Sequence, residues 1–205
     1  MADALTPDSA ALAVDRPGAI VLARHGEPLL SRRVRLNAQE YRDFWSRYEV
    51  GGIREDRPPP ADLAALAEGA GALFASTRRR SIESAQTLAP GRPFERDAIF
   101  IEAPLPPPPW PSWFRMSPSL WGFVARFWWW FFNHHGGSET RKAAEARAEQ
   151  AADILIARAS QGHDVLLLAH GFFNFMIGRA LKARGWRLVA GRGYKYWSLR
   201  RYEAR

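Results

Sequence analysis

The fold of this chain is constrained most by an alternation of short apolar runs with longer amphipathic segments. Four runs consist of Ala, Val, Ile, Leu or Phe and are too short for helices, so they predict buried strands. These runs cover residues 20–22, 72–75, 98–101 and 165–169. A last strand, at the edge of the sheet, is predicted at residues 194–199.

The segments between the runs have apolar residues at helical spacing. Helices are predicted over residues 37–48, 62–69, 139–160 and 172–184, and around Ile82, Ala85 and Leu88. Asn37 and Glu40 have the spacing of a capping box, and Ser138 is the expected cap of the long Ala-rich helix. Strands that alternate with helices predict an α/β protein, a three-layer α/β/α sandwich with a mainly parallel central sheet.

Length and composition narrow the class of protein. A chain of 205 residues suits one domain, which we expect over residues 19–205 after a flexible leader at residues 1–18. The hydrophobic fraction of 47% excludes a disordered chain, and the absence of cysteine excludes disulfides, zinc–thiolate sites and a thiol nucleophile. The net charge of +8, nearly all from arginine, is compatible with anionic substrates, nucleic acid and anionic membranes.

The start of the chain does not resemble a targeting segment. Its first residues carry acidic side chains in place of the basic start of a secretory signal. No apolar stretch reaches the roughly 20 residues that a membrane-spanning helix needs. We therefore expect a soluble, cytoplasmic protein.

Charged and titratable side chains follow the predicted strands. Arg24 and His25 end the first strand, a cluster at residues 78–80 follows the second, and His170 ends the strand at 165–169, while Glu102 ends the run at 98–101. Because parallel strands bring their carboxyl ends to one edge of a sheet, these groups can share one pocket. Two histidines and two arginines with little local acid form a site for a dianion, and a neutral histidine can act there as a nucleophile.

Other interpretations of these residues are simpler or differ in class. Any one Arg-His pair can be an ordinary strand end with solvated charges, and the arginine triplet can be a solvated charge run. The adjacent histidines 134 and 135 have no further ligands at helical spacing, so no metal site is predicted. The sequence contains neither a GxxxxGK phosphate loop nor a GxGxxG fingerprint.

Five segments in order resemble a known family. They are LARHGE at 22–27, ASTRRRSIESAQTL at 75–88, IFIE ending at residue 102, GGSET at 136–140 and VLLLAHG at 165–171. Together they resemble the RHG motif and the later motifs of the histidine phosphatase superfamily, whose fold is phosphoglycerate-mutase-like. The resemblance covers most of the chain outside the leader and the aromatic insert.

The resemblance implies a mechanism and a role for each site residue. His25 would attack phosphorus and hold a phosphohistidine intermediate. Arg24, Arg80 and His170 would bind the phosphoryl oxygens, and Glu102 would act as general acid and then as general base. The family's chemistry implies no metal and no organic cofactor. The expected activity is hydrolysis of a small-molecule phosphate ester.

The chain also departs from the family pattern. Pro28 replaces the Ser or Thr that often follows RHGE, which removes a hydroxyl group from the rim of the pocket. Arg78 or Arg79 could take the role given to Arg80, and two other carboxylates precede Glu102 within seven residues. A mutase needs a closed pocket, and nothing in the sequence indicates one. Phosphoglycerate-mutase-like phosphoryl transfer is therefore the alternative, and hydrolysis is the expected activity.

The segment at residues 103–133 is the most unusual part of the chain. It begins with a proline-rich arm, in which four consecutive prolines exclude helix and sheet interior, and continues with an intensely aromatic stretch. In the family this segment forms a lid. The aromatic side chains could pack a satellite core, close over a substrate with an apolar body, or make peripheral contact with a membrane. A non-catalytic anion-binding or RNA-binding module is a further alternative, although nucleic acid is not an expected partner because no recognition motif is present.

Overall fold

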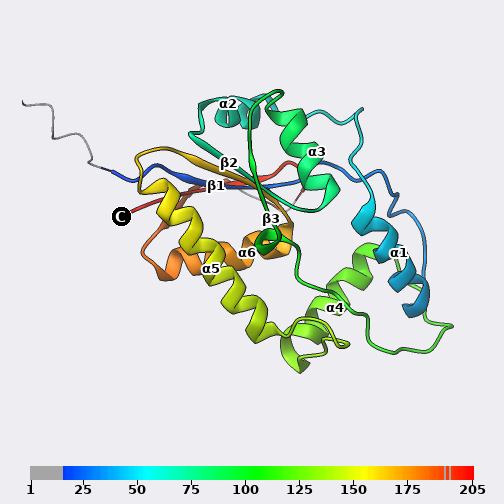
Figure 1. Ribbon diagram of the computed structural model, residues 1–205. Coiled ribbons are helices and arrows are strands. Elements are labelled where there is room, and N and C mark those ends of the chain that lie inside the picture. Colours follow the sequence, from blue (N-terminus) through cyan, green and yellow to red (C-terminus); the bar gives the residue numbers. More distant parts are fainter. Residues whose placement is uncertain (1–15, 192, 194) are drawn as a thin grey trace, which may run out of the picture.

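The computed structural model describes residues 16–191, 193 and 195–205, and most of the predicted leader lies outside these residues. Its centre is a six-stranded sheet in the order β3-β2-β4-β1-β6-β5 (Figure 1). The strands are β1 Ile20–Arg24, β2 Ala72–Ser76, β3 Glu95–Asp97, β4 Val165–Ala169, β5 Arg187–Ala190 and β6 Leu199–Glu203. The helices are α1 Ala38–Val50, α2 Ala61–Gly69, α3 Arg79–Leu88, α4 Pro118–Phe132, α5 Arg141–Ala159 and α6 Gly171–Ala183, with a 3-10 turn at Ala98–Phe100.

The sheet is mostly parallel, as the sequence predicts. β3, β2, β4 and β1 run parallel to one another, whereas β6 pairs antiparallel with both of its neighbours, β1 and β5. The apolar strands β2 and β4 are buried along their whole length, as is typical of parallel strands that are covered on both faces. This burial explains why both strands are uninterrupted apolar runs in the sequence.

Helices cover both faces of the sheet and complete the three predicted layers (Figure 1). Ile20 and Leu22 of β1 point to the face where α5 and α6 pack. Val21 and Ala23 point to the opposite face and join a cluster with α2 and α3. The alternation of side chains along β1 therefore divides the core between two helical layers.

The helices α1 and α4 lie beyond the main layers and pack on each other (Figure 1). Asn37 and Glu40 make both hydrogen bonds of the predicted capping box at the start of α1. Between the helices, the rings of Tyr41 and Trp121 stack with centroids 5.8 Å apart, and the indole of Trp121 donates to the carbonyl of Leu36 at 2.6 Å. Part of the aromatic insert thus forms the satellite core that was one of its predicted roles.

Two strand predictions are wrong. The run 98–101 is not a strand, because the side chain of Asp97 accepts a hydrogen bond from the amide of Ile99 and starts a 3-10 turn. The strand β3 lies just before it. The last strand is β6 and not residues 194–199. It lies between β1 and β5 rather than at the edge, while residue 194 lies outside the described part of the chain.

Smaller differences concern the ends of elements. The long helix α5 is capped by Thr140, whose hydroxyl accepts from the amide of Ala143, and not by Ser138. The aromatic stretch forms the helix α4, with Ser117 as its cap and Pro118 at its first position. Within the described residues, no helix is long and apolar enough to cross a membrane.

Candidate active site

The site lies where three neighbouring parallel strands end. His25 follows β1, Ser76 ends β2, and His170 follows β4, which lies between the other two strands. The rings of His25 and His170 are 5.2 Å apart between centroids. The sheet therefore brings together the two histidines that the sequence analysis placed at one edge.

Hydrogen bonds determine which nitrogen of His25 carries the proton. Nδ1 lies 2.8 Å from the carbonyl oxygen of Gly26, which can only accept, so Nδ1 is the protonated nitrogen. Nε2 accepts a hydrogen bond from Nε of Arg80 at 3.3 Å. The unprotonated Nε2 therefore has its lone pair directed toward the guanidinium group of Arg80.

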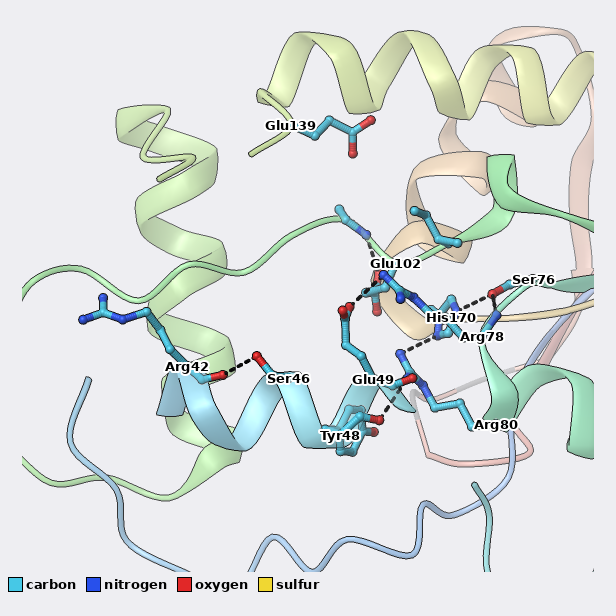
Figure 2. Close-up of polar contacts among 12 residues, drawn as sticks. Arg42, Ser46, Tyr48, Glu49, Ser76, Arg78, Arg80, Glu102, Glu139 and His170 are labelled. Atoms are coloured by element: carbon cyan, nitrogen blue, oxygen red, sulfur yellow. Dashed lines mark hydrogen bonds and ion pairs between the residues drawn. The ribbon is translucent and has the colours of Figure 1, made fainter. Parts of the chain in front are cut away.

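Arg80 joins the two histidines and the end of α1. Its Nη2 lies 3.3 Å from Nδ1 of His170. Its Nη1 donates to the carbonyl oxygens of Tyr48 at 3.1 Å and Glu49 at 3.4 Å, in the last turn of α1 (Figure 2). A cation is favourable there because the last carbonyl groups of a helix lack partners within it. The buried guanidinium group thus has four hydrogen-bond partners, the two histidine rings and two carbonyl oxygens of α1.

His170 is bound on both sides of its ring (Figure 2). Because Arg80 can only donate, Nδ1 of His170 accepts, and the proton is on Nε2. Nε2 lies 2.8 Å from Oγ of Ser76, which also accepts from the amide of Arg78 at 3.2 Å. Arg80 therefore determines the tautomer of His170, and the hydroxyl of Ser76 accepts from the protonated Nε2.

Both histidines are neutral for the same physical reasons. Burial, followed by the charge of Arg80, holds the pKa of His25 well below its usual range. The same two causes lower the pKa of His170, and the neighbouring His25 adds to them. A neutral imidazole is the form of histidine that can act as a nucleophile.

Glu102 approaches the site by a route that the sequence did not predict. It follows the 3-10 turn and not a strand, and its carboxylate lies over the first turn of α6. Its oxygens accept from the amides of Phe173 at 2.9 Å and Phe172 at 3.4 Å. The N-terminus of a helix favours an anion, so α6 fixes Glu102 next to His170, which caps the same helix (Figure 2).

Arg24 contacts the start of α6 and an aromatic side chain. Its guanidinium carbon lies 4.3 Å above the ring of Tyr196. A Cβ atom at Gly171 would lie 3.4 Å from the Arg24 side chain, which is van der Waals contact, so the arginine packs directly on the first residue of α6. Burial lowers the pKa of Arg24, as it does for Arg80, and the two cations flank the histidines.

Sequence reasoning missed three residues around the site. The ring of Tyr196 lies 5.8 Å from that of His25, and burial raises the pKa of Tyr196 to about 12. Arg32 donates to the hydroxyl of Tyr48 at 2.7 Å. Tyr196, Arg32 and Tyr48 do not end a predicted strand. Only the basic loop predicted at residues 29–35 indicated Arg32.

The alternatives for Arg80 lie elsewhere. Arg79 is exposed and pairs with Glu83 at 2.6 Å. Arg78 pairs with Glu49 at 3.1 Å (Figure 2). Among the described residues, neither guanidinium group makes a hydrogen bond to His25 or His170. Of the three arginines, Arg80 alone is buried and bonded to both of them among the described contacts.

The carboxylates that precede Glu102 also lie outside the site. Glu95 is exposed and pairs with Arg158, and Asp97 caps the 3-10 turn. Among the residues that the structure describes, no group of three or more His, Asp or Glu side chains could hold a metal ion. Glu102 is thus the carboxylate that packs beside His170.

A cavity of about 470 Å³ adjoins Arg24 and extends under α4. Its walls are largely apolar and include Leu105, Phe123, Phe172 and Phe175. Two further arginines, Arg32 and Arg126, line it, and Arg126 reaches to within 3.9 Å of Glu102. The insert therefore lines a largely apolar cavity that adjoins the site at Arg24.

Comparison with known proteins identifies the family. The model of the histidine phosphatase superfamily (branch 1) matches residues 20–198, so the chain belongs to this superfamily. The search of curated protein sequences finds no significant match.

Solved structures share the fold at low sequence identity. The protein of the open reading frame Rv3214 from Mycobacterium tuberculosis is 19% identical, with a TM-score of 0.52 over 90% of both chains. A phosphoserine phosphatase from Entamoeba histolytica is 12% identical, with a TM-score of 0.53 over 90% of this chain and 89% of that one. The ecdysone phosphate phosphatase from Bombix mori, solved with tungstate, is 13% identical, with a TM-score of 0.53 over 90% and 88%.

Proposed function

We propose that the protein hydrolyses phosphate monoesters through a phosphohistidine intermediate on His25. The observation that carries this proposal is the fixed tautomer of His25. Gly26 binds the protonated Nδ1 and leaves Nε2 unprotonated, with its lone pair accepting from Arg80 until the substrate phosphate takes over that guanidinium group. Membership of the histidine phosphatase superfamily supports the same chemistry.

In the first step, Arg24 and Arg80 bind the phosphoryl oxygens of the substrate. His170 donates to them from Nδ1 once it takes up a second proton beside the phosphate dianion, because in the free protein its proton is on Nε2 against Ser76. Cationic and N–H donors fixed around a phosphoryl group stabilise the charge that spreads over its oxygens in the transition state. The phosphate displaces the contacts that Arg80 makes with the imidazole nitrogens in the free protein. Arg80 and His170 are fully buried, so they are already removed from water before the substrate binds. Arg24 is only partly buried.

The two displacements then follow in sequence. Nε2 of His25 forms a bond to phosphorus while the bond from phosphorus to the ester oxygen breaks, and Glu102, which enters this step as the protonated carboxylic acid, gives its proton to that oxygen. Glu102 next takes a proton from water, and the resulting hydroxide displaces the phosphoryl group from Nε2 as inorganic phosphate. His25 and Glu102 return to their starting states. No step requires a metal or an organic cofactor.

The cavity beside the site supports a substrate with an apolar body. Phosphate esters of sugars would leave hydroxyl groups unpaired against its apolar wall, which costs binding energy. Two of the structures that share the fold are a phosphoserine phosphatase bound to phosphoserine and an ecdysone phosphate phosphatase. We propose that the substrate of this chain combines a phosphate monoester with an apolar group that fills the space between Phe123 and Phe175.

Hydrolysis of a generic aryl phosphate in the presence of a chelator tests this function. We expect turnover by the wild type and none by His25→Ala, while Arg79→Met, which changes an exposed arginine of the same triplet, retains full activity. Turnover by His25→Ala would contradict the proposal. Replacing Phe123 with Ser should lower the rate on naphthyl phosphate relative to glycerol phosphate, and an unchanged ratio would contradict the apolar substrate class.

A further inference from the structure

The outer side of α4 and the loop before it expose an unusual number of apolar side chains. We call this surface the aromatic face. It consists of Trp113, Phe114, Leu120, Phe123, Phe127, Phe131 and Phe132. Trp113 is 77%, Phe131 67% and Phe123 65% exposed. Monomeric soluble proteins rarely expose apolar side chains at this density unless they bind something there.

Helical spacing explains why these side chains share one side. The exposed positions 120, 123, 127 and 131 recur every three or four residues, whereas Trp121, Ala125 and Trp129 point to the protein and are buried. The rings of Phe127 and Phe131 are 4.8 Å apart. Phe127 also lies 6.0 Å from Phe132, so at least these three exposed rings form a cluster and not a scatter of single residues.

Charge indicates what kind of partner fits this face. Residues 103–138 contain no Asp and no Glu. Arg179 on α6 is exposed and lies 5.4 Å from the ring centre of Trp130, at the inner side of α4. Arg126 also belongs to α4 but lines the cavity, where it approaches Glu102. A second copy of the chain, meeting this face with its own segment 103–138, would bring no acidic side chain from that segment to pair with the arginines. A surface with negative charge and an apolar interior complements both the cations and the rings.

The aromatic face is continuous with the cavity beside the site. Phe123 belongs to the face and also lines the cavity, together with Phe172 and Phe175. The rings of Phe172 and Phe175 stack at 6.0 Å, and Trp130 contacts Phe172 at the same distance. An apolar path thus leads from the exposed rings toward Arg24 at the site.

We propose that the aromatic face docks on the surface of an anionic phospholipid bilayer. Aromatic rings on one side of a helix enter the boundary between headgroups and acyl chains, and arginines contact the headgroup phosphates. The cavity then receives a phosphate monoester whose apolar body belongs to the bilayer. This second part rests on the proposed phosphatase function, whereas the docking itself does not.

Vesicle flotation of the full chain tests the docking without any substrate. The probes are vesicles of phosphatidylcholine alone and of phosphatidylcholine mixed equally with phosphatidylglycerol. We expect binding to the mixed vesicles that falls with salt, and weak binding to the neutral ones. The double variant Phe127→Ser/Phe131→Ser should bind the mixed vesicles at least about tenfold more weakly, because both rings lose apolar contact with the bilayer.

A matched control uses Val50→Ser, which changes an exposed apolar residue at the end of α1. This variant should bind as the wild type does. Three results would overturn the proposal: no binding of the wild type, equal loss in Val50→Ser and the double variant, or undiminished binding of the double variant. A concentration-dependent dimer that the double variant abolishes, without vesicle binding, would assign the face to a second copy.

Activity separates this inference from the proposed function. The double variant lies outside the site and should hydrolyse a soluble aryl phosphate at the wild-type rate, which also shows that it is folded. His25→Ala should still float with the mixed vesicles. Loss of hydrolysis with intact flotation counts against the catalytic proposal alone, and intact hydrolysis without flotation counts against the docking alone.

Discussion

Mild acid should destabilise this protein through its two buried histidines. His25 and His170 are only 3% and 1% exposed, and burial holds the pKa of each well below the usual value near 6.5. The same histidines titrate at that usual value in the unfolded chain. Below this pH the unfolded chain binds two protons that the folded protein does not, so stability falls as the pH falls through the unfolded pKa.

The size of this effect follows from the number of protons. One histidine that stays neutral in the folded state costs about 1.4 kcal/mol of unfolding free energy between about pH 7.5 and pH 5.5. Two such histidines cost about 2.7 kcal/mol over that interval. The interval lies above the usual titration range of carboxyl groups, whose contribution is therefore small.

Urea unfolding at several pH values, in buffers without phosphate, measures this loss. His25→Gln and His170→Gln should each lose about 1.4 kcal/mol less than the wild type between the same two pH values, because each removes one buried histidine. His163→Gln, in the loop before β4, controls for the loss of a histidine as such. A wild-type stability that is flat over this interval, or the same loss in all four proteins, would refute the reasoning.

Three further predictions concern single contacts. Arg80→Met should lower kcat about 100- to 1000-fold, as the loss of one fixed transition-state donor does, while Arg79→Met leaves kcat unchanged in the same aryl phosphate assay. Ser76→Ala should lower kcat/KM about three- to tenfold, since Nε2 of His170 loses its acceptor. Trp129→Ala should cost about 3–5 kcal/mol of unfolding free energy in urea, because this fully buried indole packs α4 on the protein.

Each of these has a clear contrary result. Equal kcat for both arginine variants would show that Arg80 does not bind the phosphoryl group. A Ser76→Ala protein with wild-type kcat/KM would show that the hydrogen bond between Ser76 and Nε2 of His170 does not contribute to catalysis. A loss below about 1 kcal/mol in the tryptophan variant would mean that α4 is not held by this side chain.

The sheet and both histidines could be predicted because the signals are local. The runs that form β2 and β4 are uninterrupted and apolar, and a parallel sheet then places His25 and His170 at one edge. The strand β6 gave no such signal. Its residues LRRYE are mostly half-exposed, and only Tyr202 is buried, so pairing with β1 and not its own composition defines it.

The position of Glu102 depends on a contact across the fold. Asp97 turns the chain by binding the amide of Ile99, and the carboxylate then meets the first turn of α6, about seventy residues later in the chain. No local pattern contains that contact. Tyr196 was missed for the same reason, because it approaches Arg24 from a loop near the C-terminal end.

The helix α4 is a different case, since its signal is present in the sequence. Ser117 and Pro118 are a typical cap and first residue of a helix, and apolar residues follow at helical spacing. The density of aromatic side chains concealed this pattern because both sides of the helix are apolar. One side packs on the protein, and the other is the aromatic face.

The most direct test of the account is to trap and locate the phosphoryl group. The enzyme is mixed with a radiolabelled aryl phosphate, quenched in base, digested and analysed for phosphohistidine. We predict label on Nε2 of His25, because Gly26 holds the proton on Nδ1, and no label in His25→Ala. Label on Nδ1, label on another residue, or turnover with no labelled protein at any time would contradict the central claim.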